Sequence, residues 1–182
     1  MGREGRLVWI DLEMTGLDPQ IATIVEIATI VTDGDLHVVA EGPNLVIHQP
    51  EDALARMEPV VQQMHERSGL TAKIRASELS LAEAEAQTLA FIEQQCDERK
   101  APRCGNSIWK DRQVLTTYMK SLDAYLHYRC IDVSTIKELG RRWYPGFSPP
   151  AKKEAHRALD DILESIDELR HYRRTLFVTP AD

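Results

Sequence analysis

The sequence predicts an α/β fold, in which a mixed sheet starts with three antiparallel strands, continues with parallel strands and is flanked by helices. Two observations predict this architecture. Three strand-like runs joined by short turns lie near the N-terminus, and strand-like pieces alternate with helical segments in the second half. Short turns typically join antiparallel neighbours, whereas strands separated by helices usually pair in parallel.

The early strands are apolar runs bounded by turn residues. Leu7 to Ile10 and Ile24 to Val31 are nearly continuous apolar runs, separated by the turn signal Gly16-Leu17-Asp18-Pro19. Such runs indicate buried strands. A third strand is expected from about His37 to His48, and Gly42-Pro43 is a point where it can break.

From about Leu54 the apolar spacing becomes that of a helix. Ser80 with Glu83 resembles a capping box, which places Leu79 just outside the helix that follows. The residues expected to form the apolar face of this region recur at helical spacing: Leu79, Ala82, Ala86, Leu89, Ala90 and Ile92.

The second half of the chain alternates strand-like and helical pieces. Strands are expected near 103–105 and 130–133, helices near 111–120 and 134–143, a loop at 145–150, and a last helix from about 157 to 174. With 182 residues and no internal repeat or linker, the chain is expected to form a single domain over residues 1–182.

Composition predicts a soluble cytoplasmic protein. The chain is 43% hydrophobic and 28% charged, and no segment approaches the roughly 18 apolar residues of a membrane helix. The run Leu7 to Ile10 is too short for a signal-peptide core. Cys96, Cys104 and Cys130 are widely spaced and form no Cys-x-x-Cys pair, which indicates reduced, mostly buried thiols.

The formal net charge of −7 restricts the partners. Proteins that hold long nucleic acids usually neutralise phosphates with a basic surface. A long duplex is therefore not expected as a partner. Any polynucleotide substrate should be short or be bound through metal ions.

Acidic residues follow two of the expected strands. Asp11 and Glu13 end the first strand, where the period-2 alternation projects both side chains from one face. Solvated acids at a strand end are the ordinary alternative. Asp111 follows Gly105-Asn106-Ser107, where a strand gives way to a helix; such junctions hold ligand sites in α/β sheets, although an Asp there can equally be an N-cap.

Helical geometry separates the neighbouring acids Asp160 and Asp161. The apolar stripe of the last helix comprises Ala158, Leu159, Ile162, Ile166 and Leu169. At about 100° per residue, Asp160 points nearly opposite this stripe, whereas Asp161 lies on its flank, where a helix meets the sheet. Asp161 is therefore the better ligand candidate, and Asp160 is expected to be a solvated charge.

His156 lies just before that helix, after a loop with Pro149 and Pro150. A histidine in such a loop is commonly just exposed. Beside a water activated for hydrolysis, however, its imidazole could accept a proton near neutral pH.

Taken together, Asp11-x-Glu13, Asp111 and His156-x4-Asp161 resemble the DEDDh branch of the DnaQ-like exonuclease superfamily, which has a ribonuclease-H-like fold. Within it, several segments resemble the oligoribonuclease family: Val8 to Leu17, His127-Tyr128-Arg129, Asp132 to Thr135 and His156 to Leu159. The resemblance covers nearly the whole chain.

This resemblance implies a metal-dependent 3′→5′ exoribonuclease of RNA degradation, acting on very short RNA and especially dinucleotides. Asp11, Glu13, Asp111 and Asp161 would be ligands to two Mg²⁺ or Mn²⁺ ions, with Asp11 bridging. Carboxylate oxygens suit these hard cations, and two ions about 4 Å apart can stabilise attacking and leaving oxygens. His156 would take the proton of the attacking water, releasing a nucleoside 5′-monophosphate.

The resemblance also implies substrate contacts. Leu17 would be an apolar wedge against the bases, Ser107, Arg129 and Ser134 would lie near the 5′ phosphate, and Tyr128 would come from the partner subunit of a homodimer. Each has an ordinary alternative: Leu17 as a turn-packing residue, Tyr128 and Arg129 as a surface pair, and Ser134 as an N-cap.

The chain departs from several family members at Val60, where they carry Trp in a Met-x-x-Trp arrangement. Stacking of an aromatic ring contributes about 1 to 3 kcal/mol per base. The departure therefore bears on substrate affinity or base preference and leaves the chemistry intact.

Two other functions are compatible with these features. One is a related exonuclease that uses the same residues on longer strands, as in proofreading or tRNA trimming. The other is a binding module that keeps the fold but has no activity. Substrate length discriminates the first, and the presence of all the catalytic-type residues argues against the second.

Overall fold

The computed structural model describes residues 3–16, 18, 21–151 and 157–177. A mixed five-stranded sheet in the order β3-β2-β1-β4-β5 forms the centre. Its strands are β1 (Leu7–Met14), β2 (Ile24–Thr32), β3 (Val38–Val46), β4 (Pro102–Gly105) and β5 (His127–Asp132). The helices are α1 (Glu51–Leu54), α2 (Pro59–Arg67), α3 (Leu70–Ala76), α4 (Leu81–Gln95), α5 (Ile108–Tyr118), α6 (Lys120–Tyr125), α7 (Val133–Trp143) and α8 (Ala158–Thr175).

The strand pairing confirms the predicted fold class. β1 pairs antiparallel with β2, and β2 pairs antiparallel with β3. β4 pairs parallel with β1, and β5 pairs parallel with β4. The first three strands are therefore antiparallel, and the two later strands, which follow helical connections, are parallel to their neighbours.

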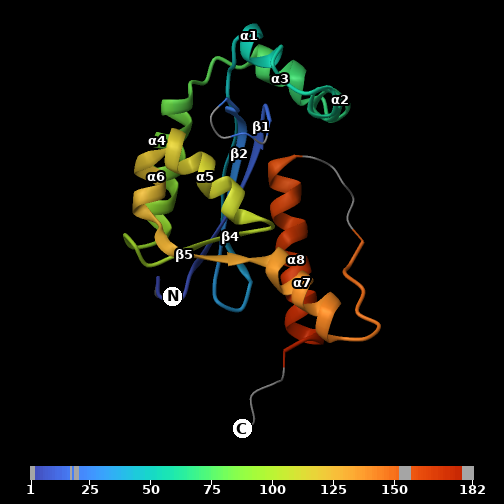
Figure 1. The fold of residues 1–182 in the computed structure, drawn as a ribbon. Helices are drawn as coiled ribbons and strands as arrows, with labels where there is room; N and C mark the ends of the chain where they lie inside the picture. The colour runs from blue at the N-terminus through green and yellow to red at the C-terminus, as the bar shows by residue number, and fades with distance from the viewer. Residues whose placement is uncertain (1–2, 17, 19–20, 152–156, 178–182) are drawn as a thin grey trace.

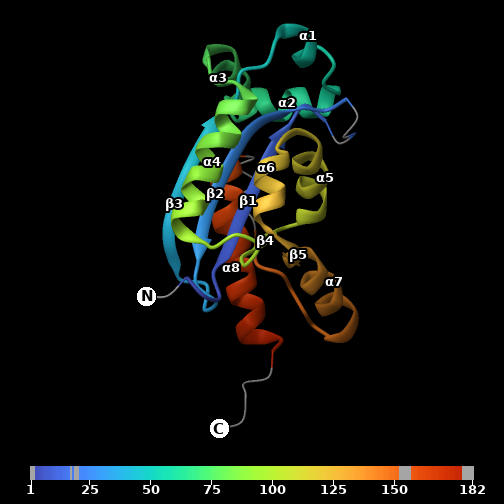
Figure 2. The same cartoon turned by 90° about the vertical axis from the view of Figure 1, so that its left-hand side faces the viewer.

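Helices cover both faces of the sheet. Figure 1 shows the sheet nearly edge-on, with α4, α5 and α6 on one side and α7 and α8 on the other; Figure 2 shows α8 passing behind the strands. Val8, Ile10 and Leu12 pack toward α4 to α6, whereas Trp9 packs against α8. Because strand side chains alternate, Asp11 and Glu13 share the face of Trp9 and point to the side of α8.

Helices α1 to α3 lie together at one end of the sheet (Figure 1). Their buried side chains Leu54, Met57, Leu70 and Ile74 pack with Val25 of β2 in a small separate core. This end is the one at which β1 terminates, so these helices adjoin the acidic residues of β1.

The predicted elements differ from the structure in their limits. β1 continues through Asp11 and Glu13 to Met14, so both acids lie inside the strand. β3 does not break at Gly42-Pro43; instead its register with β2 shifts there, because Ala28 pairs with Asn44 and Ile30 with Glu41. The helix expected over 111–120 begins earlier, at Ile108, and ends at Tyr118, where the separate helix α6 follows.

Helix α4 has the predicted cap but a different buried face. Ser80 and Glu83 form the capping box, and Leu79 lies outside the helix. The predicted face was wrong for Ala82, Ala86 and Ala90, which are exposed, because the helix buries a stripe of Ala84, Thr88 and Ile92. Alanine is small and only weakly apolar, so it occurs on both buried and exposed faces of helices. The alanines of this segment therefore did not show which face of the helix is buried.

Within the described residues, no helix is long and apolar enough to cross a membrane. Cys96, Cys104 and Cys130 are free thiols, of which the first two are buried and the third is half-buried.

The revised face of α4 gives a prediction for matched variants. Ala84→Gln places an amide in a fully buried position and should lower the free energy of unfolding by about 1 to 3 kcal/mol. Ala86→Gln, two residues away on the exposed face, should change it by less than about 0.5 kcal/mol. Urea unfolding measures both, and equal losses would contradict this orientation.

Candidate active site

The first two acids of the site belong to the central strand of the sheet. Asp11 is half-buried and Glu13 is only 7% exposed. Both lie on the face of β1 that carries Trp9, whose indole Nε1 donates a hydrogen bond of 3.0 Å to Thr32 Oγ1. The strand is thus fixed next to the pair, and the predicted shared face is confirmed.

Helix α8 brings a third carboxylate to this face. Asp161 lies in its first turn, and one carboxylate oxygen each of Asp11, Glu13 and Asp161 lies within 4.8 Å of the others. Asp160 is exposed and Asp161 is half-buried, as the helical geometry predicted. Residues separated by about 150 positions in the sequence thereby form one acidic cluster.

Asp111 reaches the same region from the other side of β1. It is 6% exposed in the first turn of α5, and its Oδ1 accepts a hydrogen bond of 3.2 Å from the Leu12 backbone N–H. The N-cap of α5 is Ser107, so the alternative reading of Asp111 as an N-cap is wrong. A buried acid bonded to the strand between Asp11 and Glu13 is a further oxygen donor beside the cluster.

Burial and, after it, the charges of neighbouring acids raise the pKa values of these carboxyl groups. Burial, followed by the charges of Asp111, Asp161 and Glu13, raises the pKa of Asp11 well above its usual range. Burial, followed by the charge of Asp161, raises the pKa of Glu13 to about 8. Burial likewise raises the pKa of Asp111 to about 7, against the lowering effect of backbone hydrogen bonds.

Two residues that the sequence did not single out, Glu26 and Arg157, support the cluster. Glu26 lies opposite Glu13 in the β1–β2 register and is fully buried. The Arg157 guanidinium donates to both of its oxygens, at 2.6 Å and 3.0 Å, and Ala158 N–H donates at 3.3 Å. Glu26 therefore anchors the start of α8 to β2, one turn before Asp161.

His65 of α2 is a third residue that the sequence analysis missed. It is fully buried, its Nδ1 lies 3.9 Å from Glu13 Oε2, and its Nε2 lies 2.8 Å from the Met14 carbonyl oxygen. Its position in a helix 52 residues after Glu13 gave no local signal. This contact ties the α1 to α3 end of the molecule to the acidic cluster.

The predicted substrate residues fall into two groups. Ser107 and Ser134 lie together: Ser107 N–H donates to Ser134 Oγ at 3.0 Å, and the two hydroxyl oxygens are 3.2 Å apart. Tyr128 and Arg129 lie on β5, the strand at the edge of the sheet; the Tyr128 side chain is 64% exposed, and the Arg129 guanidinium lies 5.3 Å from its ring centroid.

The remaining sequence assignments concern Leu17, His156 and Val60. Leu17 and His156 lie outside the described residues. Val60 lies in the first turn of α2 and is 68% exposed, so its side chain is accessible at the position where several family members carry Trp.

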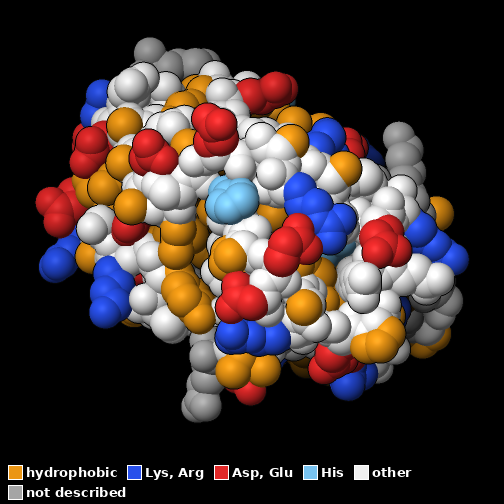
Figure 3. Space-filling model, turned by 90° about the horizontal axis from the view of Figure 1, so that it is seen from above, with side chains coloured by type: hydrophobic (Ala, Val, Ile, Leu, Met, Phe, Trp, Pro, Cys, Tyr) orange, Lys and Arg blue, Asp and Glu red, His pale blue; other side chains and the backbone are white. Residues whose placement is uncertain are grey.

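The surface around the α1 to α3 end lacks a dominant basic patch. Figure 3 views the molecule from this end and shows acidic and basic side chains interspersed, without a continuous basic stripe on the described surface in view. This pattern agrees with the net charge of −7.

Comparison with known families identifies the class of this fold and site. The family model described as Exonuclease matches residues 8–169, which include all four carboxylates. The chain belongs to the exonuclease family. Its curated relatives include the oligoribonuclease of Dichelobacter nodosus, 54% identical over all of both chains, and that of Pseudomonas aeruginosa, 58% identical over 92% of this chain and 93% of the relative.

Solved exonuclease structures share the fold. The zinc-bound form of Escherichia coli exonuclease I in complex with single-stranded DNA has a TM-score of 0.76 and 15% identity, and the alignment covers 95% of this chain. Exonuclease I of Methylocaldum szegediense has a TM-score of 0.71 and 19% identity. The chain spans 41% of the length of either protein, so this fold corresponds to one part of those enzymes.

The acidic cluster of this exonuclease-family chain fits divalent cations. All of its donor atoms are carboxylate oxygens, which Mg²⁺ and Mn²⁺ prefer. The raised pKa values of Asp11 and Glu13 support the same site, because a cation among several neighbouring carboxylates favours their ionised forms.

The raised pKa values predict how stability depends on pH in the absence of metal. An acid with a raised pKa holds its proton in the folded state where the unfolded chain has lost it, so stability falls as pH rises from about 5 to about 8. Added Mg²⁺ or Mn²⁺ should raise the melting temperature most at the upper end of this range, because metal binding requires deprotonated carboxylates.

Thermal melts with a chelator and with each metal, recorded between pH 5 and pH 8.5, measure this effect. Glu13→Gln removes one of the titrating groups and should flatten the metal-free profile. Melting temperatures that respond to metal equally at all pH values would contradict the role of these carboxylates.

Proposed function

We propose that this metal-dependent 3′→5′ exoribonuclease hydrolyses very short RNA, especially dinucleotides, to nucleoside 5′-monophosphates. The observation that carries the proposal is the acidic cluster of Asp11, Glu13 and Asp161, with Asp111 beside it. The curated relatives that match over nearly the full chain are named oligoribonucleases, which supports RNA of few nucleotides as the substrate.

The four carboxylates would hold two Mg²⁺ or Mn²⁺ ions. Such ions, when bound, supply Lewis-acid stabilisation of the attacking and leaving oxygens of the displacement. Asp11 and Glu13 are held by the strand, Asp161 by the first turn of α8 and Asp111 by its bond to Leu12 N–H. These rigid elements keep the four carboxylates in fixed positions relative to one another, as a preorganised site requires.

His156 is proposed as the general base. It would accept a proton from the attacking water while the water oxygen bonds to phosphorus and the bond to the 3′ oxygen of the remaining chain breaks. The phosphate then stays on the 5′ carbon of the released nucleotide. An imidazole titrates near neutral pH, which suits this transfer.

The preference for very short RNA is proposed to come from contacts to the 5′ phosphate. Ser107, Ser134 and Arg129 would lie near it, with Leu17 against the bases. A group that binds the 5′ end at a fixed distance from the carboxylates excludes longer chains. The scarcity of basic surface supports this restriction, because a longer RNA would need more phosphate contacts than this acidic chain offers.

A degradation assay over RNAs of two to seven nucleotides tests the substrate. With Mg²⁺ or Mn²⁺, a dinucleotide should be cleaved much faster than a heptanucleotide with the same 3′ end. Equal or reversed rates would instead favour an exonuclease of longer strands. Asp161→Asn should abolish this cleavage, whereas the neighbouring exposed variant Asp160→Asn should retain it; equal activity of both would exclude the proposed site.

The proposed base is tested by His156→Asn. Loss of general base catalysis should lower kcat by about 10²- to 10⁴-fold with little change in KM. Single-turnover kinetics separates this from an effect on substrate binding. A change confined to KM would assign His156 to binding instead.

We further propose a homodimer in which Tyr128 acts in the active site of the partner subunit. Tyr128 is largely exposed on an edge strand, where it stacks on His127 with ring centroids 4.5 Å apart. A large exposed aromatic residue on a sheet edge is well placed for an interface.

Mixing two inactive variants tests this arrangement. Tyr128→Ala and Asp161→Asn should each be defective alone, but mixed dimers should regain activity, because one site then has an intact cluster and the Tyr128 of the other subunit. Light scattering measures the oligomeric state. An active monomer, or mixtures without any regained activity, would refute the exchange.

A further inference from the structure

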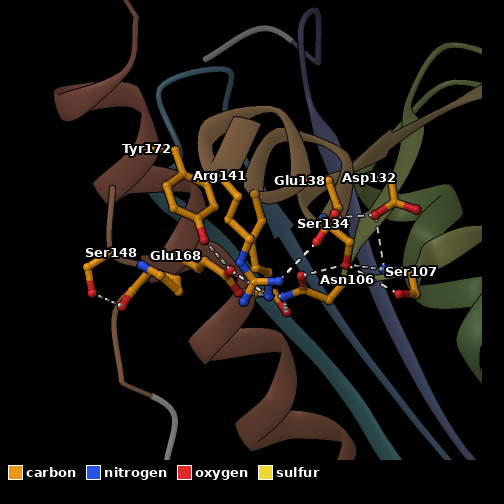
Figure 4. Close-up of polar contacts among 12 residues, drawn as sticks. Asn106, Ser107, Asp132, Ser134, Glu138, Arg141, Ser148, Glu168 and Tyr172 are labelled. Atoms are coloured by element: carbon orange, nitrogen blue, oxygen red, sulfur yellow. Dashed lines mark hydrogen bonds and ion pairs between the residues drawn. The ribbon is translucent and has the colours of Figure 1, made fainter. Parts of the chain in front are cut away.

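A polar network runs from the surface loop at Ser107 into the protein. Figure 4 shows Asn106 lying between the Ser107–Ser134 pair and Glu168 of α8. The three elements involved are the β4–α5 loop, the start of α7 and the middle of α8. None of the interior members of this network is one of the proposed metal ligands.

We propose that Asn106 is a positioning residue for recognition of the 5′ phosphate. Its side-chain carbonyl accepts the hydroxyl proton of Ser134, so that Ser107 Oγ–H is the donor to the phosphate. The inference rests on the proposed function, which assigns both serines to the 5′ end without distinguishing their roles.

The orientation of the Asn106 amide follows from its interior partners. Asn106 Nδ2 donates to Ser165 Oγ at 2.8 Å and to Glu168 Oε2 at 2.9 Å. Ser165 is 3% exposed and donates its own proton to the Asp161 carbonyl oxygen at 2.7 Å, so it can only accept from Asn106. Both amide protons are thus directed inward.

Glu168 strengthens this orientation because it is a buried anion. Its side chain is 1% exposed; Lys137 Nζ lies 2.9 Å from Oε1, and the Tyr172 hydroxyl donates to Oε1 at 2.5 Å. Burial alone would raise its pKa, but the hydrogen bonds from Tyr172, Lys137 and Asn106 lower it below its usual value. A flipped Asn106 would turn its carbonyl oxygen toward this carboxylate and remove one of the donors to a buried anion.

The fixed orientation of the Asn106 amide determines the direction in which the Ser134 hydroxyl donates its proton. Asn106 Oδ1 faces the loop and accepts from Ser134 Oγ–H at 3.0 Å, since a carbonyl oxygen cannot donate. Ser134 has no second proton, so its Oγ acts as an acceptor toward Ser107, whose backbone N–H lies 3.0 Å away. In the contact of 3.2 Å between the two hydroxyls, Ser107 must be the donor.

The backbone of Ser107 is held in an uncommon conformation that exposes its hydroxyl. Its φ of 53° lies in the left-handed region, which is sparsely populated by residues other than glycine. Its N–H also donates to Asp132 Oδ1 at 3.0 Å, and the same oxygen accepts from Ser134 N–H at 2.9 Å. The β4–α5 loop and the start of α7 are therefore joined by two backbone N–H groups that share the Asp132 carboxylate, as well as by the hydroxyl pair.

The oxygens of an ionised phosphate accept hydrogen bonds. They therefore bind the serine whose hydroxyl proton is available, which is Ser107. Ser107 is exposed and can turn its O–H from Ser134 to a ligand at the cost of one weak neutral hydrogen bond. The Ser134 hydroxyl already donates its proton to Asn106 Oδ1. Ser107 is thus the direct contact, whereas Ser134 and Asn106 act through it.

The test compares one dinucleotide with a 5′ phosphate and with a 5′ hydroxyl, and reads the ratio of the two kcat/KM values. Ser107→Ala should lower this ratio roughly tenfold to a hundredfold, the usual contribution of a hydrogen bond to a charged group. Ser134→Ala should lower it less, because Ser107 keeps its hydroxyl and its bond to Asp132. Thr135→Ala, an exposed neighbour of Ser134, serves as the control with an unchanged ratio.

Asn106→Ala should lower the ratio through a higher KM for the phosphorylated dinucleotide, and in a Ser107→Ala background it should cause no further loss. Glu168→Gln, which lets the Asn106 amide turn over, should act in the same direction and serves if Asn106→Ala does not fold. Thermal melts of all variants check folding.

Several outcomes would overturn the inference. A ratio unchanged in Asn106→Ala or in Glu168→Gln would mean that this network has a structural role only. A larger loss in Ser134→Ala than in Ser107→Ala would reverse the proton assignment. Either result leaves the proposed function standing if the wild type prefers the phosphorylated dinucleotide, whereas a wild type without activity on dinucleotides would overturn both.

Discussion

The ion pair between Glu26 and Arg157 is the interaction on which the geometry of the site depends. It joins the third residue of β2 to the residue just before α8, and Glu26 also accepts from Ala158 N–H. Without the guanidinium, α8 would begin beside a buried uncompensated carboxylate in a region that already holds several acids. Breaking such a pair from one side typically costs about 3 to 5 kcal/mol. Arg157 thus allows Asp161 to approach Asp11 and Glu13 before any cation is present.

The orientation of α8 also stabilises the ionised carboxylates of the cluster. Its N-terminus points into the acidic cluster, and the partial positive charge at a helix N-terminus stabilises nearby carboxylates. The pKa values of Asp11 and Glu13 are nonetheless raised, first by burial and then by the neighbouring carboxylates. The fold therefore holds a set of like charges that is stable only when protons or cations balance it, which is the compromise expected of a functional site.

The sequence predicted the parts of the site that depend on periodicity. The period of a strand placed Asp11 and Glu13 on one face, and the period of a helix separated Asp161 from Asp160. It could not predict Glu26, which lies within a continuous apolar strand and whose partner Arg157 is 131 residues away. His65 was missed for the same reason, since a helix from a different part of the chain brings it to Glu13. The rotation of α4 was mispredicted because alanines mark a helical face only weakly.

Helix α8 connects the carboxylate cluster to the interior network through one of its faces. Asp161, Ser165 and Glu168 follow one another at spacings of four and three residues, which places them on one side of the helix. Ser165 donates to the Asp161 carbonyl and accepts from Asn106, so the loop bearing Ser107 is bonded to the turn bearing Asp161. The rise from Asp161 to Glu168 is about 10 Å along a rigid helix. A rigid element of fixed length between the cluster and the serine pair can set the length of the substrate more reproducibly than a flexible loop, because the spacing changes only if the helix itself is deformed.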